Sequence, residues 1–397
     1  MIFNEALYPI FLFISVLVFH IVPKNFKPWW IFICGTTFYA YYADVFIFLF
    51  IIETIVVYVL LRQFRQNLFA FIFTLIFSIG ILIYFKYRNM VLISVFSVLD
   101  TFQSGELPTF DRFILPLAIS FFTFEFIHYI VDVYKGKIKP HNFKEFLAFI
   151  MFFPTMVAGP IKRFQDFVPK MENATFSFKD LSSGITRIII GLAKKIIIAD
   201  SMDLWIQPIQ SITGIAGADS YTLWIALFAY GIKIYSDFSG YSDIAIGSAR
   251  LFGITIPENF AYPYFQANIR RFWRCWHISL TKWIIDYIYI PLGGSKCSFK
   301  RTAFNILAAM SISGIWHGAA WHFVLWGLYH GFLLALNSFY RQKIKPHIAW
   351  IDKFSIVINP ISTVFTFILV TFGWALFVMP IENFKNALPK LLFLAGW

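Results

Sequence analysis

Two histidines lie in strongly apolar sequence in the C-terminal part of the chain: His277 in RRFWRCWHISLTKWIIDYIYIPLGG and His317 in SGIWHGAAWHFVLWG. An ionisable imidazole is costly to place among such residues in a bilayer, so it is usually retained for a function. Gly314 and Gly318 would let a backbone or a substrate approach the His317 ring, as a buried catalytic base requires. We therefore expect an intramembrane chemical site, with a merely structural, hydrogen-bonded histidine as the alternative.

A basic edge precedes the first of these histidines. Arg270, Arg271 and Arg274 alternate with tryptophans, and on a helical wheel the tryptophans share one face while Arg270, Arg274 and His277 follow its flank. This pattern predicts an interfacial or re-entrant helix. Its guanidiniums could anchor the helix to lipid phosphates, or they could bind the phosphates of a ligand whose remainder enters an apolar channel.

Carboxylates also occur in apolar surroundings. Asp237, Tyr241 and Asp243 lie in IKIYSDFSGYSDIAIGSARLFG, and Asp286 is the single acid of the basic stretch. Such carboxylates usually pair with a base or a hydroxyl, so we expect them to form a polar network that supports the site. Metal binding is the less favoured interpretation, because no third hard ligand follows at a regular spacing.

The positions of other polar side chains predict a packing role for them. Glu125, His128 and Asp132 form a stripe along one predicted span, which is typical of a buried network that holds helices together; a proton path is the second interpretation. His322 and His330 need not share the face of His317 and are interpreted as packing or network residues.

The amino-acid composition indicates the environment of the chain. Of 397 residues, 59% are hydrophobic, 14% are charged and 51 are phenylalanines, which is too apolar for a water-soluble core. The net charge of +12 lies in short loops between apolar runs, which favours anionic lipid over nucleic acid as its counterpart. Three separated cysteines predict neither a disulfide framework nor a thiolate metal site.

Apolar runs near the length of a membrane span recur throughout. The sequence predicts an all-α polytopic protein of roughly 10–12 helices, with one transmembrane domain over 1–397 and tilted, re-entrant or broken helices around a central funnel. The expected spans are 7–23, 29–43, 45–61, 67–85, 113–134, 145–160, 184–200, 221–236, 302–315, 319–339, 354–378 and 384–397. The short runs 29–43, 145–160 and 302–315 are the candidates for irregular helices.

Basic loops orient the first helices. Lys24 and Lys27 precede a tight pair of apolar runs, and Arg62 and Arg65 follow it. The positive-inside bias places both loops in the cytoplasm and the N-terminus outside. The first apolar run has no basic segment before it, so we expect an uncleaved helix rather than a signal peptide.

The motifs resemble a known family. FWRCWHISLTKWIIDYIYIPLGG, GIWHGAAWHFVLWG and DFSGYSDIAIG with PENFAYPY are similar to the membrane-bound O-acyltransferase superfamily, in the branch of the alginate and peptidoglycan O-acetyltransferase membrane proteins. The teichoic-acid D-alanylation acyltransferases are related to that branch. The similarity extends upstream through FFPTMVAGPIKRFQDFVPK and covers nearly the whole chain. Glu125 and His128 depart from the pattern expected of the family, which leaves their role open.

This resemblance implies a site and a reaction. The two functional histidines of the family map onto His317 and His277, and Arg270, Arg271 and Arg274 would hold the phosphates of the acyl donor. The implied activity is transfer of an acetyl group from a cytoplasmic thioester, acetyl-CoA, towards an extracytoplasmic polysaccharide. A separate extracytoplasmic acetyltransferase would be the partner, the bacterial inner membrane the location, and no bound cofactor is expected.

Two other functions remain open at this point. The sequence contains no nucleotide-binding loop, no Gly-x-Ser-x-Gly elbow and no His-Glu-x-x-His motif. It therefore gives no motif support for ATP-driven transport or for the usual serine or zinc hydrolysis. A proton-coupled transporter or flippase for a polymer precursor would use the histidines as a relay and the arginines as an anion gate. A scaffold for polysaccharide assembly would need neither histidine.

Overall fold

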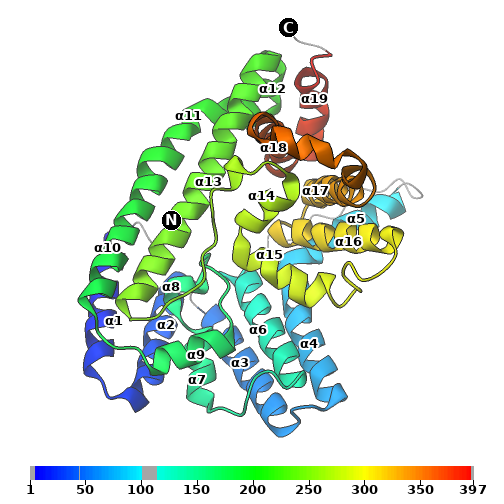
Figure 1. Ribbon diagram of the computed structural model, residues 1–397. Helices are drawn as coiled ribbons and strands as arrows, with labels where there is room; N and C mark the ends of the chain where they lie inside the picture. Colours follow the sequence, from blue (N-terminus) through cyan, green and yellow to red (C-terminus); the bar gives the residue numbers. More distant parts are fainter. Residues whose placement is uncertain (1–4, 44, 101–113, 395–397) are drawn as a thin grey trace. The chain divides into compact units, whose positions relative to one another are not determined.

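The computed structural model describes residues 5–43, 45–100 and 114–394, and these residues form helices and loops without a strand. Figure 1 shows the helices along the chain. The chain divides into two compact units, one of residues 1–190 and 241–257 and the other of residues 191–240 and 258–397. The all-α fold predicted from the hydrophobic pattern is confirmed. That the units form one transmembrane domain stays a prediction, as does the central funnel.

The first unit contains the N-terminal helices. Their bounds are α1 Leu7–Ile21, α2 Lys27–Ala43, α3 Phe46–Gln63, α4 Leu68–Leu82, α5 Arg88–Asp100, α6 Ile119–Tyr134, α7 Phe143–Ile150, α8 Phe153–Met156, α9 Phe164–Glu172 and most of α10 Phe178–Ala193.

The second unit contains most of the later helices, and α13 runs from it into the first unit. Their bounds are α11 Asp203–Ile206, α12 Ile212–Gly217, α13 Ser220–Leu251, α14 Ile269–Cys275, α15 Ile278–Ile284, α16 Phe299–His317, α17 Trp321–Phe339, α18 Ser355–Val378 and α19 Ile381–Leu391.

Four helical stretches of the described chain are long and apolar enough to cross a membrane. They are Phe46–Gln63, Leu68–Phe96, Trp321–Ile348 and Ser355–Val378, and α1 is a shorter apolar helix. Much of their apolar surface faces outward; Phe48 and Phe69, for example, are 65% and 78% exposed. Such surface requires lipid as its solvent. A multi-pass membrane protein is therefore confirmed.

Some predicted spans take another form. The short run 145–160 is broken into α7 and α8, as its length and Pro154 suggest. The run 384–397 corresponds to α19, which has 11 residues and is amphipathic, so within the described residues it is not a span; residues 395–397 lie outside the description. The beginning of the run 113–134 also lies outside, and the helix there starts at Ile119.

The polar sequence around Asp237 forms part of an unbroken helix. α13 has 32 residues, although the apolar pattern predicts a span only over 221–236. Gly240 and Gly247 lie inside this helix without interrupting it. A Cβ on Gly247 would lie 2.6 Å from the Gly184 carbonyl oxygen, and one on Gly240 would lie 2.6 Å from that of Gly191. These two glycines of α13 therefore let the backbone of α10 approach closely.

A helical hairpin carries His317 at its turn. α16 ends at His317 and α17 begins at Trp321. A Cβ on Gly314 would overlap the carbonyl oxygen of Phe323, and a Cβ on Gly327 would overlap that of Met310. These glycines thus let the backbones of α16 and α17 approach closely, which fixes the two helices against each other. Close approach of a substrate to the His317 ring stays a prediction.

An aromatic core lies beside this hairpin in the second unit. It combines α14 with α17 and α18, and its buried residues include Trp273, Trp276, Trp326 and Trp374. The indole of Trp276 is 5.0 Å from that of Trp374 between ring centroids, and Trp273 is 5.5 Å from Trp326. These large rings give the segment around His277 a rigid support.

Candidate functional site

His277 has an unusual backbone conformation. It lies between α14 and α15 with φ 43° and ψ 56°, in the left-handed region. This conformation costs a residue other than glycine roughly 1–2 kcal/mol, although histidine is among the side chains that adopt it more often. The predicted continuous basic helix is therefore wrong: it is divided at His277 into two short helices. Strain at one residue is typical of functional sites, where the surroundings hold the conformation in place.

Hydrogen bonds from a neighbouring loop hold this break. The backbone N–H of Ile278 donates to the carbonyl oxygen of Asn259 at 2.9 Å, and that of Ala261 donates to the carbonyl oxygen of Cys275 at 3.0 Å. The side-chain oxygen of Asn259 accepts from the Ser279 hydroxyl at 2.6 Å and from the Ser279 N–H at 3.3 Å. The loop is therefore bonded to the chain on both sides of His277.

The imidazole of His277 is buried without hydrogen bonds. It is 1% exposed, and within the described chain neither ring nitrogen has a hydrogen-bond partner. The ring contacts Phe238 at 4.6 Å and Trp316 at 6.0 Å between centroids. Burial, and secondarily the nearby His317, hold the pKa of His277 well below its ordinary value of 6.5. His277 lies outside the four spanning stretches and is neutral at physiological pH.

His317 contacts the same tryptophan as His277. The His317 ring is 4.7 Å from that of Trp316 and 5.1 Å from those of Trp326 and Phe377. Its side chain is partly exposed, while Trp316 is buried. The structure thus brings the two predicted histidines to one indole within the second unit. A neutral imidazole beside a partly accessible one in an apolar setting can serve acid–base chemistry.

The three arginines occupy α14, directly before His277. Arg271 and Arg274 are exposed and Arg270 is half-buried. Among the described residues no carboxylate forms an ion pair with them, so their charges are available to an anion. The predicted basic edge is present, although neither a donor phosphate nor a lipid phosphate is yet assigned to it.

The predicted supporting residues do not form one cluster around the histidines. Asp237 pairs with Lys195 at 3.0 Å in the second unit, and Asp243 pairs with Arg187 at 2.7 Å in the first. Tyr241, also in the first unit, is 3% exposed, and Asp286 lies half-buried in the π-helical segment Ile285–Tyr289 that continues α15. Pairing with a base is confirmed for Asp237 and Asp243, while support of catalysis stays a prediction.

Glu125, His128 and Asp132 form the expected buried network on α6 of the first unit. Glu125 pairs with Lys162 at 2.5 Å, and His128 Nε2 accepts from the N–H of Phe164 at 2.9 Å. Asp132 accepts from Gln165 at 3.0 Å. All three residues thus bind the segment that leads into α9. The network ties this segment to α6, as its structural interpretation predicts.

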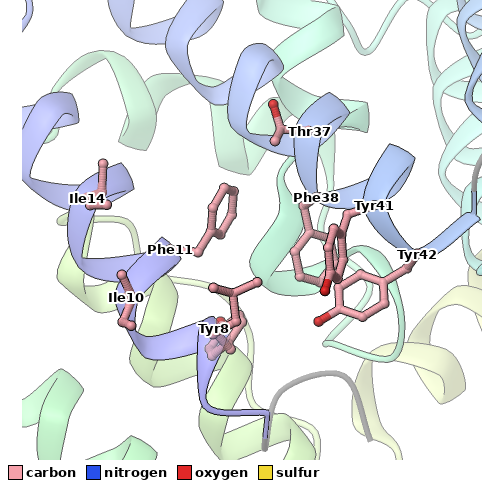
Figure 2. A pocket seen from close by; sticks show the side chains of 9 residues that line it. Tyr8, Ile10, Phe11, Ile14, Thr37, Phe38, Tyr41 and Tyr42 are labelled. Atoms are coloured by element: carbon pink, nitrogen blue, oxygen red, sulfur yellow. The ribbon is translucent and has the colours of Figure 1, made fainter.

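A surface pocket in the first unit is of a different kind. It lies between α1 and α2, and Figure 2 shows its lining of aromatic and aliphatic side chains, among them Phe11, Ile14 and Phe38. The Tyr8 hydroxyl is bonded to Ser248 at 2.8 Å, and that of Tyr42 to Glu5 at 2.8 Å. The lining contains no histidine, lysine or arginine, so it differs in kind from the histidine- and arginine-containing region around His277.

Two features near the histidines go beyond the sequence analysis: Asn259, which it did not single out, and the full burial of His330, which it interpreted as a packing or network residue. Asn259, in the PENF string, is fully buried and bonded to the residues that follow His277. His330 is fully buried, and neither of its ring nitrogens has a partner in the described chain; its ring lies 5.0 Å from Trp326, which also contacts His317. The Pro-x-Asn-Phe string before the tryptophan-rich stretch was the available signal for Asn259. The apolar surroundings alone could not distinguish His330 from a packing residue.

Comparison with known proteins gives the family context. The probable alginate O-acetylase AlgI of Pseudomonas aeruginosa is 34% identical over 95% of this chain and 72% of its own length. The AlgI protein of Azotobacter vinelandii is 38% identical over 74% of this chain and 56% of its own. The peptidoglycan O-acetyltransferase of Helicobacter pylori is 29% identical over 100% of this chain and 80% of its own. The matches thus span between about half and four-fifths of the relatives.

The matched region contains both histidines and the three arginines. The sequence model of MBOAT, the membrane-bound O-acyltransferase family, matches residues 101–381. This range includes α14 to α17, where Arg270, His277 and His317 lie. With a family match over most of its length and a relative that is 34% identical over 95% of the chain, the chain belongs to the membrane-bound O-acyltransferase family.

Proposed function

We propose that this chain is a membrane O-acetyltransferase that moves an acetyl group from acetyl-CoA in the cytoplasm towards the hydroxyl groups of an extracytoplasmic polysaccharide. The observation that carries the proposal is that the rings of His277 and His317 both contact the Trp316 indole. The relatives named for alginate and peptidoglycan O-acetylation support the acetyl group and the polysaccharide as substrate classes. The bacterial inner membrane is the proposed location.

The site residues can carry out the chemistry as follows. An acceptor hydroxyl attacks the thioester carbonyl carbon, and His317 takes its proton. The tetrahedral oxyanion then collapses, the carbon–sulfur bond breaks, and the imidazolium returns the proton to the leaving thiolate. The products are an acetyl ester and the free thiol of CoA. The surrounding aromatic rings exclude water and so protect the acetyl group from hydrolysis.

His277 has a separate role in this proposal. Because its pKa is held low, it stays neutral and presents one N–H donor and one acceptor nitrogen. It can therefore orient the donor carbonyl or the attacking hydroxyl beside His317 without taking the proton. The arginines of α14 would hold the donor phosphates. The direct acceptor would be a hydroxyl of an extracytoplasmic acetyltransferase partner that passes the acetyl group to the polymer.

The test is replacement of His317. In cells that lack the native gene, His317→Ala and His317→Gln should lower the O-acetyl content of the surface polysaccharide, because losing a general base costs about 10²–10⁴-fold in rate. His347→Ala is the matched control, since His347 is an exposed histidine of the same unit. Wild-type acetylation by a His317→Ala protein that accumulates normally in the membrane would overturn the assignment.

A second assay separates transfer from transport. Proteoliposomes containing the purified chain and labelled acetyl-CoA should release free CoA thiol when a hydroxyl acceptor is supplied. A transporter or flippase would give flux of the intact substrate without cleavage of the thioester.

A further inference from the structure

The observation that goes furthest beyond the two histidines is the attachment of the Asn259 loop to the chain around His277. Asn259 is fully buried. Its backbone carbonyl accepts from Ile278, and its side-chain oxygen accepts from both donors of Ser279. Three hydrogen bonds thus connect one residue to the two residues directly after His277.

These bonds constrain the backbone where it is strained. The first N–H groups of a helix need acceptors, and the His277 side chain makes no capping bond to α15. The Asn259 side chain takes that place from a distant part of the chain. The N–H of Thr281 donates to the His277 carbonyl at 2.9 Å, so His277 itself forms the first helical bond of α15. α15 therefore begins immediately after His277, and His277 has its left-handed conformation at this junction.

The side chain of His277 has no hydrogen bond of its own to orient it. Ring contacts to Phe238 and Trp316 fill the space around it, but within the described residues both of its nitrogens are unpartnered. The backbone angles set the position of the Cα–Cβ bond, and packing against Phe238 and Trp316 limits the two side-chain torsions. A group that holds the backbone therefore helps to keep the imidazole in its place between these rings.

We propose that Asn259 is a positioning residue for the acyl-transfer site: it holds His277 in the left-handed conformation that directs the imidazole towards Trp316 and His317. This proposal rests on the proposed function. Asn259 would not contact the donor or the acceptor, and its effect on catalysis would pass entirely through His277.

The expected effect lies in turnover rather than in donor binding. Asn259→Ala removes the acceptor for Ser279, so the imidazole can rotate away, and misplacement by about 1 Å costs on the order of 10²-fold in rate. We expect kcat for CoA release to fall by about that factor with the KM for acetyl-CoA little changed. Ser279→Ala removes one donor and leaves the other bonds, so it should reduce kcat by a smaller factor.

A double-mutant cycle distinguishes positioning from a general loss of stability. In a His277→Ala background, Asn259→Ala should cause no further loss of the residual transfer rate, because the group that it positions is already absent. Asn305→Ala is the matched control: Asn305 is an equally buried asparagine of the same unit that donates to the Gly294 carbonyl at 3.0 Å, away from His277 in the sequence. It should lower the rate by similar factors with and without His277.

The outcomes separate the two proposals. If the wild-type chain releases no CoA, the proposed function fails, whatever Asn259 does. If the wild-type chain is active and Asn259→Ala keeps its kcat, the positioning role is overturned. It is also overturned if Asn259→Ala reduces the rate as strongly without His277 as with it.

Discussion

Trp316 is the residue through which the two imidazoles share one environment. Its indole meets His277 and His317 edge-on, at interplanar angles of 64° and 70°. Such edge contacts let aromatic rings pack densely, and they leave the His277 nitrogens buried without a hydrogen-bond partner in the described chain. Burying a histidine without a hydrogen bond destabilises the folded protein, so such a residue is usually kept only where a bound substrate supplies the missing hydrogen bonds. This favours a site that acquires its polar partners only when the donor and acceptor bind.

At the same scale, substitution of the α14 arginines tests how the donor is bound. Arg270→Ala combined with Arg274→Ala should raise the KM for acetyl-CoA by roughly tenfold or more, because each charged hydrogen bond to a phosphate contributes about 1.5–3 kcal/mol to binding. The rate at saturating donor should change less, since phosphate contacts act in the ground state and the transition state alike. Donor-concentration curves of the purified variants measure both quantities.

The control for this prediction is a basic pair elsewhere in the same unit. Arg341 and Lys343 are exposed and follow α17, so Arg341→Ala with Lys343→Ala removes equal charge. If the two double variants use the donor equally well, the α14 arginines serve as a lipid anchor.

At the scale of elements, the sequence predicted helices better than it predicted their breaks. Uniformly apolar stretches such as 354–378 were found nearly to the residue, because hydrophobic length alone defines a span. The break at His277 was missed, since the bonds that hold it come from Asn259 in a distant loop. The continuity of α13 was missed because the apolar pattern ends at residue 236, whereas the helix continues through glycines that allow close packing against α10. Tertiary contacts decided both cases.

The same limit applies to the candidate site. The histidines could be found from their apolar surroundings, and the structure brings them to Trp316. The acids could not be assigned correctly, because Asp237 and Asp243 lie six positions apart in the sequence but pair with bases in different compact units.

The hairpin of α16 and α17 gives a prediction about packing. Gly314→Ala should reduce the amount of folded protein in the membrane, because its Cβ would overlap the Phe323 carbonyl oxygen and the helices would have to separate. Since His317 ends α16, acetyl transfer per molecule should fall as well. Detergent-solubilised yield, thermal unfolding and specific activity measure these effects.

Gly80→Ala is the matched substitution in another apolar helix. A Cβ at Gly80 would have no neighbour within 4 Å among the described residues, so the change should be neutral or slightly stabilising. Equal yields and unfolding temperatures for the two variants would contradict the close packing at Gly314.

At the scale of the whole molecule, basic residues near the ends of helices predict the orientation in the membrane. Not all of these residues are exposed. Lys24 and Arg62 are exposed, as the positive-inside bias requires. Lys27 is buried, with its ammonium bonded to the Ala174 carbonyl oxygen at 2.7 Å and 4.6 Å from the centre of the Phe19 ring. Lys27 thus contributes to packing within the first unit, and the predicted cytoplasmic position of the loop before α2 would depend mainly on Lys24.

The resulting orientation can be measured with single cysteines in a chain whose three native cysteines are replaced. α2 and α3 have 17 and 18 residues, and if they cross the membrane as a pair, Asn25 and Gln63 emerge on one side and Val45 on the other. In right-side-out spheroplasts a membrane-impermeant maleimide should label Val45→Cys at once, whereas Asn25→Cys and Gln63→Cys should react only after permeabilisation. This result places the N-terminus outside, because α1 then crosses once before Lys24.

Labelling of Asn25→Cys and Gln63→Cys from opposite sides would contradict the paired crossing, and labelling of both in intact spheroplasts would reverse the orientation. In that case α1 would enter from the cytoplasm, and the positive-inside bias would fail for this pair of helices.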